Sequence, residues 1–276
     1  MSTVEGYDEQ DLTRKQRREQ ACAQRRELEE AEAASAKRRT RLIQLGIVVG
    51  IVAVVIAVIL LATGGSSKTG IPKSSKAVNS TVTEVTSLLQ GIPQSGNTIG
   101  NPNAPVTLQY FGDLQCPVCK QFTLGALPPL IQSYVRSGKL KIEYHSMETA
   151  TREPAIFNTQ QIAALAAGKQ NLAWHYLELF YREQGEEDTG YVTESYLQNL
   201  ARQVPGLNLA AWMAARSDPA LAASVTSDAQ AANTNGFTGT PSFLIGKTGG
   251  TQQKFEPGSL TETASYNAAI EKLLNG

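Results

Sequence analysis

The chain has 276 residues, and its 25 lysines and arginines balance its 25 aspartates and glutamates. This length allows one sizeable core with additional segments, and the balanced charge gives no indication of a nucleic-acid partner. The three cysteines, Cys22, Cys116 and Cys119, are too few for a small domain held together by disulfides.

An apolar, uncharged run over residues 42–62 follows a highly charged segment over residues 1–41. A membrane-spanning helix needs about 20 apolar residues, so residues 42–62 are predicted to be a single transmembrane anchor. A cleaved signal peptide is the alternative, but its apolar region is usually only about 7–15 residues long. Lys37 to Arg41 contribute four basic residues directly before the run. The positive-inside rule therefore predicts a cytoplasmic tail, and an extracytoplasmic domain at the cell membrane.

Glycine, serine and lysine dominate residues 63–78, which predicts a flexible tether within a linker over residues 63–90. Apolar positions inside residues 79–89 indicate a short helix in this linker. The globular domain is predicted to occupy residues 91–276. Cys22 lies in the cytoplasmic tail, a reducing compartment, and its role stays open.

The first half of the domain has the pattern of a βαβ unit. Residues 106–111 (VTLQYF) predict a buried strand, and residues 140–145 (LKIEYH) predict a second strand. Between them, a helical stretch begins at Cys116 and continues to Val135. This order predicts an α/β fold.

A helical block over about residues 154–235 follows, with Thr193 and Asp218 as predicted N-caps. Strand patterns return at residues 242–245 and 252–255, after which Thr261 is predicted to cap a last helix.

The Cys116-Pro117-Val118-Cys119 motif is predicted to open a helix, which brings both sulfurs within reach of a disulfide. Pro117 suits the first helical position, where its missing N–H costs no hydrogen bond. Unpaired N–H groups at a helix N-terminus stabilise a thiolate, so Cys116 is predicted to be the nucleophile. Cys119, one turn further on, is predicted to be buried and to resolve the mixed disulfide.

Two other interpretations of the cysteine pair carry less weight. A zinc half-site needs about four ligands, and His145 and His175 are isolated in the sequence, so no metal is predicted. A purely structural disulfide would close so short a loop that it would constrain the unfolded chain little. No cofactor is predicted besides a redox-active Cys116–Cys119 disulfide.

With its context, this motif resembles the DsbA-like branch of the thioredoxin superfamily. The resemblance extends from about Gly91 to the C-terminus and rests on three segments: residues 91–105 (GIPQ and GNPNAP within them), 111–119 (FGDLQCPVC) and 236–243 (GFTGTPSF). It implies a thioredoxin fold with a helical domain inserted at about residues 154–235. It also implies a cis Pro241 facing the cysteine pair, with Thr240 before it helping to set reactivity and to bind extended substrates.

The sequence departs from this family at two positions. Val118 replaces the histidine of strongly oxidising members, which removes a potential cation near Cys116. Tyr110 stands where relatives often have a carboxylate, so proton transfer to Cys119 needs another route. Asp113 and Glu143 are the candidates for that route.

The favoured function is an extracytoplasmic thiol–disulfide oxidoreductase that donates disulfides to exported proteins through Cys116 and Cys119. The resemblance implies a membrane redox partner, of the DsbB type or similar to vitamin K epoxide reductase. A tethered reductase or isomerase would use the same residues in the reverse direction. A non-catalytic binding module on this fold is a third alternative, which the intact cysteine pair and the Thr240-Pro241 segment argue against.

Overall fold

The computed structural model describes residues 75–276, so the predicted tail over residues 1–41 and anchor over residues 42–62 lie outside the described residues. Within residues 75–276, no helix is both long enough and apolar enough to cross a membrane. The first part of the predicted tether, up to residue 74, also lies outside the described range.

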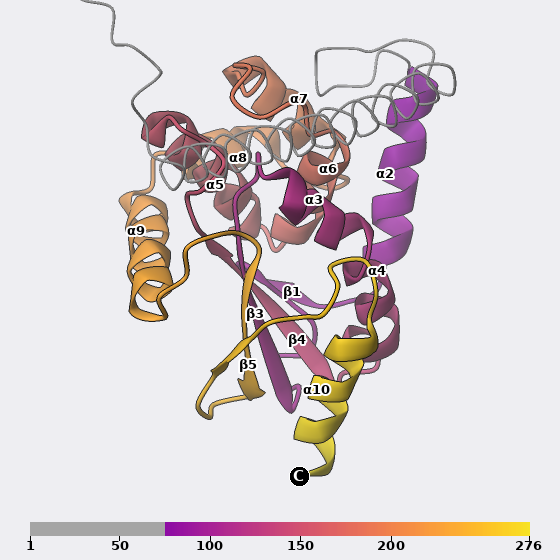
Figure 1. Ribbon diagram of the computed structural model, residues 1–276. Coiled ribbons are helices and arrows are strands. Elements are labelled where there is room, and N and C mark those ends of the chain that lie inside the picture. Colours follow the sequence, from indigo (N-terminus) through magenta and orange to yellow (C-terminus); the bar gives the residue numbers. More distant parts are fainter. Residues whose placement is uncertain (1–74) are drawn as a thin grey trace, which may run out of the picture. The chain divides into compact units, whose positions relative to one another are not determined.

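The described residues form a mixed sheet surrounded by helices (Figure 1). The strands are β1 (Gln94–Ser95), β2 (Thr98–Ile99), β3 (Val106–Gly112), β4 (Leu140–Ser146), β5 (Ser242–Lys247) and β6 (Gln253–Phe255). The helices are α2 (Ser75–Leu89), α3 (Pro117–Leu124), α4 (Leu127–Leu130), the π-helix η1 (Ile131–Val135), α5 (Pro154–Gly168), α6 (Ala173–Arg182), α7 (Glu194–Gln203), α8 (Leu209–Ala215), α9 (Pro219–Thr234) and α10 (Ala264–Asn275).

The sheet has the strand order β1-β2-β4-β3-β5-β6. Strand β3 pairs in parallel with β4 and antiparallel with β5, so β3 lies at the centre. The predicted βαβ unit is therefore present, with α3, α4 and η1 between its two strands. The short hairpin of β1 and β2, which pairs with β4, was not predicted, because two-residue strands are too short to show an alternating pattern.

One face of the sheet is packed into the main core. Consecutive residues of a strand point to opposite faces, so Leu108 and Tyr110 of β3 lie on the same face. Tyr110 stacks on Phe243 of β5, its partner across the two strands, with ring centroids 5.6 Å apart. Tyr266 of α10 and Phe122 of α3 cover these rings. Helices α3 and α10 therefore protect this face.

The opposite face is covered by α9. Phe111 of β3 and Leu244 of β5 form a second, smaller apolar cluster with Met147 and Ala232, the last of which lies on α9. In Figure 1, α9 and α10 lie on opposite sides of the sheet, in agreement with this packing.

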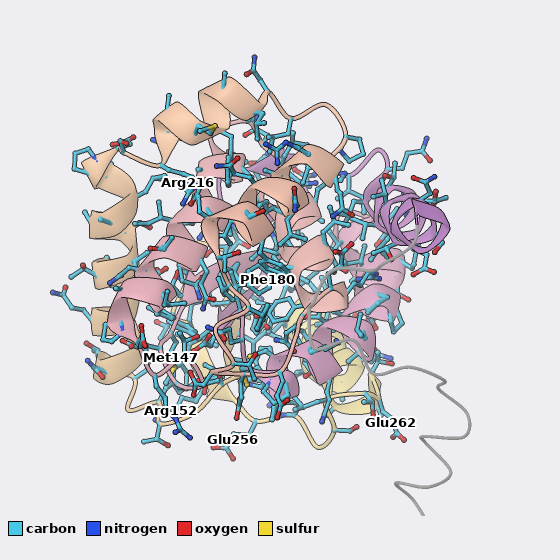
Figure 2. The ribbon with its side chains drawn as sticks, turned by 90° about the horizontal axis from the view of Figure 1, so that it is seen from above. Met147, Arg152, Phe180, Arg216, Glu256 and Glu262 are labelled. Carbon is cyan, nitrogen blue, oxygen red and sulfur yellow. The ribbon has the colours of Figure 1, made fainter. Side chains whose placement is uncertain are left out.

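The helical block predicted at about residues 154–235 corresponds to α5 to α9, which enter the chain between β4 and β5. Thr193 and Asp218 cap α7 and α9 as predicted, each accepting a hydrogen bond from a backbone N–H of the first turn. In Figure 1, α5 to α8 gather beyond one end of the sheet, and Figure 2 shows Phe180 of α6 at the centre of this layer. Arg152 and Glu256 lie at the lower edge of the view in Figure 2.

Three sequence predictions need correction. The short helix predicted at residues 79–89 is present as α2, but it begins at Ser75, and its Val85 and Leu89 are buried in the core, so the folded unit begins before residue 91. Thr263, rather than Thr261, is the N-cap residue of α10, and its side chain forms no capping hydrogen bond. The helix predicted from Cys116 to Val135 is divided into α3, α4 and η1.

The chain passes close to a distant loop at Gly125, directly after α3. A Cβ atom there would lie 2.7 Å from the Cα of Thr261, because the loop before α10 crosses closely at this point. The Gly125 backbone also leaves the helical region, with φ −102° and ψ −91°. The backbone N–H of Ala126 bonds to the Leu260 carbonyl oxygen of this loop at 3.2 Å, and Pro128 and Pro129 have no N–H to continue the helical hydrogen bonds.

A partly buried ion pair joins the helical insertion to the sheet. His145 of β4 contacts Asp228 of α9 at 2.7 Å through Nδ1, while the other Asp228 oxygen accepts the Ser146 backbone N–H at 2.8 Å. The second ring nitrogen of His145 lies 3.9 Å from the Glu143 carboxylate. Burial by itself would lower the pKa of His145, but Asp228 and Glu143 outweigh burial and raise the pKa to about 9.

We expect this pair to make the stability of the fold depend on pH. The pKa of an unfolded histidine is about 6.5, so the protonated His145 stabilises the fold fully below that pH, and this contribution is lost as pH rises through about 9. The difference in free energy of unfolding between wild type and His145→Gln should shrink by up to about 3 kcal/mol over this range. Urea unfolding of the oxidised proteins at a series of pH values measures it.

The matched control is His175→Gln. Burial lowers the pKa of His175, so its contribution should not decrease between pH 6.5 and pH 9. If the difference in free energy of unfolding between wild type and His145→Gln did not change with pH, His145 would not be charged in the folded protein.

Candidate active site

The cysteine pair lies where β3 passes into α3. Cys116 is the N-cap residue of α3, with an extended backbone at φ −71° and ψ 119°, and Pro117 is at the first helical position. The Cys116 sulfur accepts the backbone N–H of Cys119 at 3.4 Å, as an N-cap side chain does. Both cysteines are thiols in the structure. The predicted placement of the motif at a helix N-terminus is therefore confirmed.

The two thiols have opposite pKa shifts. A hydrogen bond from the Cys119 thiol, with further hydrogen bonds from Thr240 and the α3 backbone, lowers the pKa of Cys116 to about 6 despite burial. Burial raises the pKa of Cys119 well above its usual value, because that side chain is completely buried. Near neutral pH, Cys116 is therefore mainly a thiolate and Cys119 is a thiol.

We expect selective alkylation of Cys116 in the reduced protein. Its rate with iodoacetamide should rise with the thiolate fraction and reach half its maximum near pH 6, while Cys119 stays essentially unmodified. Timed quenching followed by fragment mass spectrometry locates the adduct. Equal rates at the two sulfurs, or a midpoint near the ordinary cysteine value of about 8.5, would contradict the asymmetry.

The loop before Cys116 is held by one buried carboxylate, that of Asp113. It accepts the backbone N–H groups of Thr149, Ala150 and Thr151 at 2.9 to 3.0 Å. It also accepts the backbone N–H of Gln115, the Thr151 hydroxyl and the Gln160 amide. Asp113 therefore joins the active-site loop to the loop that follows β4, and these contacts occupy both of its oxygens.

Thr240 and Pro241 lie beside the cysteines, as predicted. The peptide bond between them is cis, and the Thr240 carbonyl oxygen is 3.5 Å from the Cys116 sulfur. A groove of about 450 Å³ extends from this point. Its lining includes Val118, Phe237, Thr240, Pro241, Phe255 and Leu260. Val118 is one of the few large apolar side chains of the described residues that is exposed. Thr240 lines this groove, and its carbonyl oxygen is next to the Cys116 sulfur, so a segment that lies along the groove would pass close to Cys116.

The structure adds a contact residue that the sequence did not indicate. Gln184, just after α6, donates its side-chain amide to the carbonyl oxygens of Leu114 and Cys116 at 2.7 and 3.1 Å. Lys120 of α3 in turn donates to the Gln184 carbonyl oxygen at 3.3 Å. Gln184 is 70 positions away from Leu114 in the sequence. Patterns among neighbouring residues therefore could not predict this contact.

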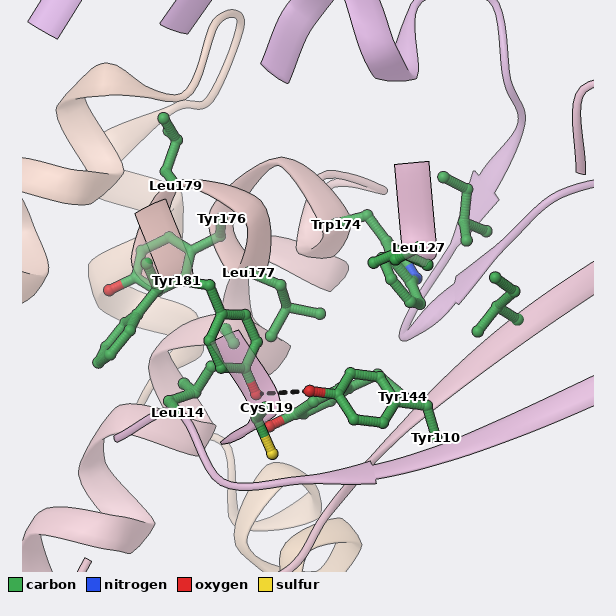
Figure 3. Packing of buried hydrophobic residues seen from close by; sticks show 14 of the residues in the cluster. Tyr110, Leu114, Cys119, Leu127, Tyr144, Trp174, Tyr176, Leu177, Leu179 and Tyr181 are labelled. Carbon is green, nitrogen blue, oxygen red and sulfur yellow. Dashed lines mark hydrogen bonds between the residues drawn. The ribbon is translucent and has the colours of Figure 1, made fainter. Parts of the chain in front are cut away.

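Neither predicted candidate for proton transfer is placed for that role. The side chain of Asp113 is committed to the loop contacts described above. Glu143 pairs with Lys141 at 2.9 Å and faces His145, whose hydrogen bond together with Lys141 lowers the pKa of Glu143 to about 2. Three tyrosines, Tyr110, Tyr144 and Tyr181, instead lie around Cys119 (Figure 3).

The histidines of the described residues lie apart from the thiols. His145 is paired with Asp228, and His175 contacts Gln94 at 3.0 Å. Across residues 75–276, no group of three or more histidine, cysteine and carboxylate side chains is arranged to hold a metal ion. The cysteine pair thus has no further metal ligand from this part of the chain.

Comparison with known proteins agrees with this geometry. The chain is 27% identical over 112 residues to the probable disulfide bond formation protein D of Bacillus anthracis, covering 38% of this chain and 48% of the relative. It is 26% identical over 111 residues to disulfide bond formation protein D of Bacillus subtilis, covering 38% and 46%. The matched region spans about half the length of these curated relatives.

Two solved structures show the same fold. Oxidised BdbD from Bacillus subtilis has a TM-score of 0.56 at 20% identity, covering 67% of this chain and 97% of that chain. The DsbA of Chlamydia trachomatis has a TM-score of 0.53 at 16% identity, covering 65% and 91%. Residues 94–257, more than half of the chain, match the family model described as thioredoxin. The chain therefore belongs to the thioredoxin family and has the DsbA-like form of its fold.

Proposed function

We propose that this protein is a thiol–disulfide oxidoreductase that donates the Cys116–Cys119 disulfide to other proteins. The observation that carries the proposal is the opposite pKa shift of two adjacent thiols at one helix N-terminus, beside the Thr240 carbonyl oxygen. A thiolate with a pKa near 6 is a good leaving group at neutral pH. The names of the Bacillus relatives, which refer to disulfide bond formation, support the same direction.

The exchange proceeds in two displacements. A substrate thiolate attacks the Cys116 sulfur, a substrate–Cys116 bond forms, and the electron pair of the broken disulfide goes to Cys119. A second substrate thiolate then attacks the substrate sulfur of this mixed disulfide, and Cys116 leaves as a thiolate. The substrate becomes oxidised by two electrons, and the protein becomes a dithiol.

The setting of this reaction also belongs to the proposal. The charged segment over residues 1–41 and the apolar run over residues 42–62 support a membrane tether with the catalytic domain outside the cytoplasm. Proteins that leave the cytoplasm still need disulfides, so they are the proposed substrates. A membrane redox partner, of the DsbB type or similar to vitamin K epoxide reductase, would return the dithiol to the disulfide. No bound cofactor is required.

The redox state in cells tests the direction. A disulfide donor should hold Cys116 and Cys119 mainly as a disulfide at steady state, with a reduction potential between about −270 and about −120 mV. Cells are quenched with acid, and free thiols are alkylated with a mass tag. A mainly reduced pair with a potential at or below about −270 mV would overturn the donor function in favour of a tethered reductase. If the protein exchanged disulfides with neither insulin nor a thiol peptide, it would be a non-catalytic binding module on this fold.

A further inference from the structure

The buried side of Cys119 faces tyrosine hydroxyls rather than a charged group. Tyr110 of β3, Tyr144 of β4 and Tyr181 of α6 are each about 1% exposed. Burial, followed by the neighbouring Cys119 side chain, raises the pKa of Tyr110, and Figure 3 shows the Tyr110 ring next to Cys119. Figure 3 shows the three side chains converging on the sulfur from different elements. The described groups nearest to this sulfur on its buried side are therefore uncharged.

The hydroxyls are arranged as a directed chain of hydrogen bonds. Tyr110 donates to the Tyr181 oxygen at 3.0 Å, and Tyr181 donates to the Asp113 carbonyl oxygen at 3.2 Å. The Cys119 S–H is directed to the Cys116 sulfur, while the Tyr110 hydrogen is held by the Tyr181 oxygen. Tyr144 directs its own hydrogen to the Gly112 carbonyl oxygen or to Gln161, each at 3.0 Å. Tyr110 is thus the hydroxyl that can turn its hydrogen toward the sulfur.

Room for this hydroxyl depends on a glycine. A Cβ atom at Gly112 would lie 3.0 Å from the Tyr110 oxygen and 3.0 Å from the Tyr144 ring. The backbone between β3 and the cysteine motif therefore passes directly beside the two phenols. A larger residue at this position would displace the Tyr110 hydroxyl.

We propose that Tyr110 is a catalytic residue that donates a hydrogen bond to the Cys119 thiolate when the disulfide opens. This inference rests on the proposed function, because Cys119 is the leaving group of the first displacement. One negative charge moves from the attacking thiolate to the Cys119 sulfur as the new bond to Cys116 forms. Rotation of the Tyr110 hydroxyl moves its hydrogen from the Tyr181 oxygen to the Cys119 thiolate.

Tyr110 keeps its own proton throughout this step. Burial raises its pKa well above the usual value, so the phenol is not a base for Cys119. Tyr181 acts only through Tyr110 and is a positioning residue: its oxygen holds the Tyr110 hydrogen while Cys119 is protonated. Loss of Tyr181 as an acceptor should therefore leave the Tyr110 hydrogen free to point at the sulfur.

The test is the rate at which dithiothreitol reduces the Cys116–Cys119 disulfide of the full-length chain, measured at one pH. Tyr110→Phe keeps the ring and removes the hydroxyl, and the rate should fall about 10- to 100-fold, the effect of one hydrogen bond to a charged atom. Tyr181→Phe should react as fast as wild type or faster. Tyr176→Phe, which removes a buried hydroxyl bonded to the Leu197 carbonyl oxygen, is the matched control and should leave the rate unchanged.

A further readout separates the donor from a general packing effect. Alkylation of Cys116 in the reduced protein should be the same in Tyr110→Phe and wild type within about twofold, because Tyr110 is proposed to act on Cys119. Unchanged reduction of Tyr110→Phe, or an equal slowing in Tyr181→Phe, would overturn the inference. If wild type itself formed no reducible Cys116–Cys119 disulfide, the proposed function would fail first, and the two failures are thus distinguishable.

Discussion

Cys116→Ser is expected to abolish disulfide exchange, with a loss on the order of a thousandfold or more. A hydroxyl stays protonated near neutral pH, whereas the Cys116 thiol, with a pKa of about 6, is mainly ionised. Cys119→Ala should behave differently, because its Cys116 thiolate can still attack a substrate disulfide, while no Cys119 thiol is present to displace the substrate. It should accumulate long-lived mixed disulfides with substrates. Oxidation of a reduced thiol peptide measures the first effect, and non-reducing gels reveal the second.

The third cysteine provides the control for this series. Cys22→Ser makes the same chemical change in the segment predicted to lie across the membrane from the domain, and it should keep wild-type exchange. If Cys116→Ala, and not Cys119→Ala, accumulated mixed disulfides with substrates, Cys119 would be the nucleophile and Cys116 the resolving cysteine. Loss of exchange in Cys22→Ser would contradict a reaction confined to the Cys116–Cys119 pair.

Asp113→Asn is expected to destabilise the protein strongly. The Asp113 carboxylate accepts hydrogen bonds on both oxygens, from three backbone N–H groups of the loop after β4 among others. An amide has one oxygen, and its NH₂ group would face donors, so several buried donors lose their partners. Each such loss costs about 1–3 kcal/mol, so the free energy of unfolding should fall by about 3 kcal/mol or more. Urea unfolding of the oxidised proteins measures the change.

The same substitution at Asp218 is the control. Asp218 caps α9 from a partly exposed position, accepting the backbone N–H of Ala220 at 2.9 Å, and asparagine caps a helix about as well as aspartate. Asp218→Asn should therefore change stability little. A stability of Asp113→Asn close to wild type would show that the carboxylate is not needed to hold the two loops together.

Local patterns in the sequence were sufficient for the elements of the βαβ unit and for the cysteine motif. Strands β3 and β4 are apolar or alternating over seven residues each, which gives a clear period. The capping roles of Thr193 and Asp218 depend on residues two or three positions away, and the N-cap position of Cys116 depends on the adjacent Pro117. The cis Thr240–Pro241 bond was expected from a family resemblance rather than from its own neighbours.

Tertiary structure alone decided what surrounds the sulfurs. The Gln184 contact to the loop, the hydroxyl chain from Tyr110 to Tyr181, and the pairing of His145 with Asp228 each join residues about 70 or more positions apart. The close approach at Gly125 likewise involves a loop more than 100 residues later. Hydrogen bonds and close packing depend on distances in space, whereas periodicity and capping report only on neighbours along the chain. The sequence by itself therefore located the reactive cysteines, and the fold determined which groups set their pKa values and which hydroxyl faces Cys119.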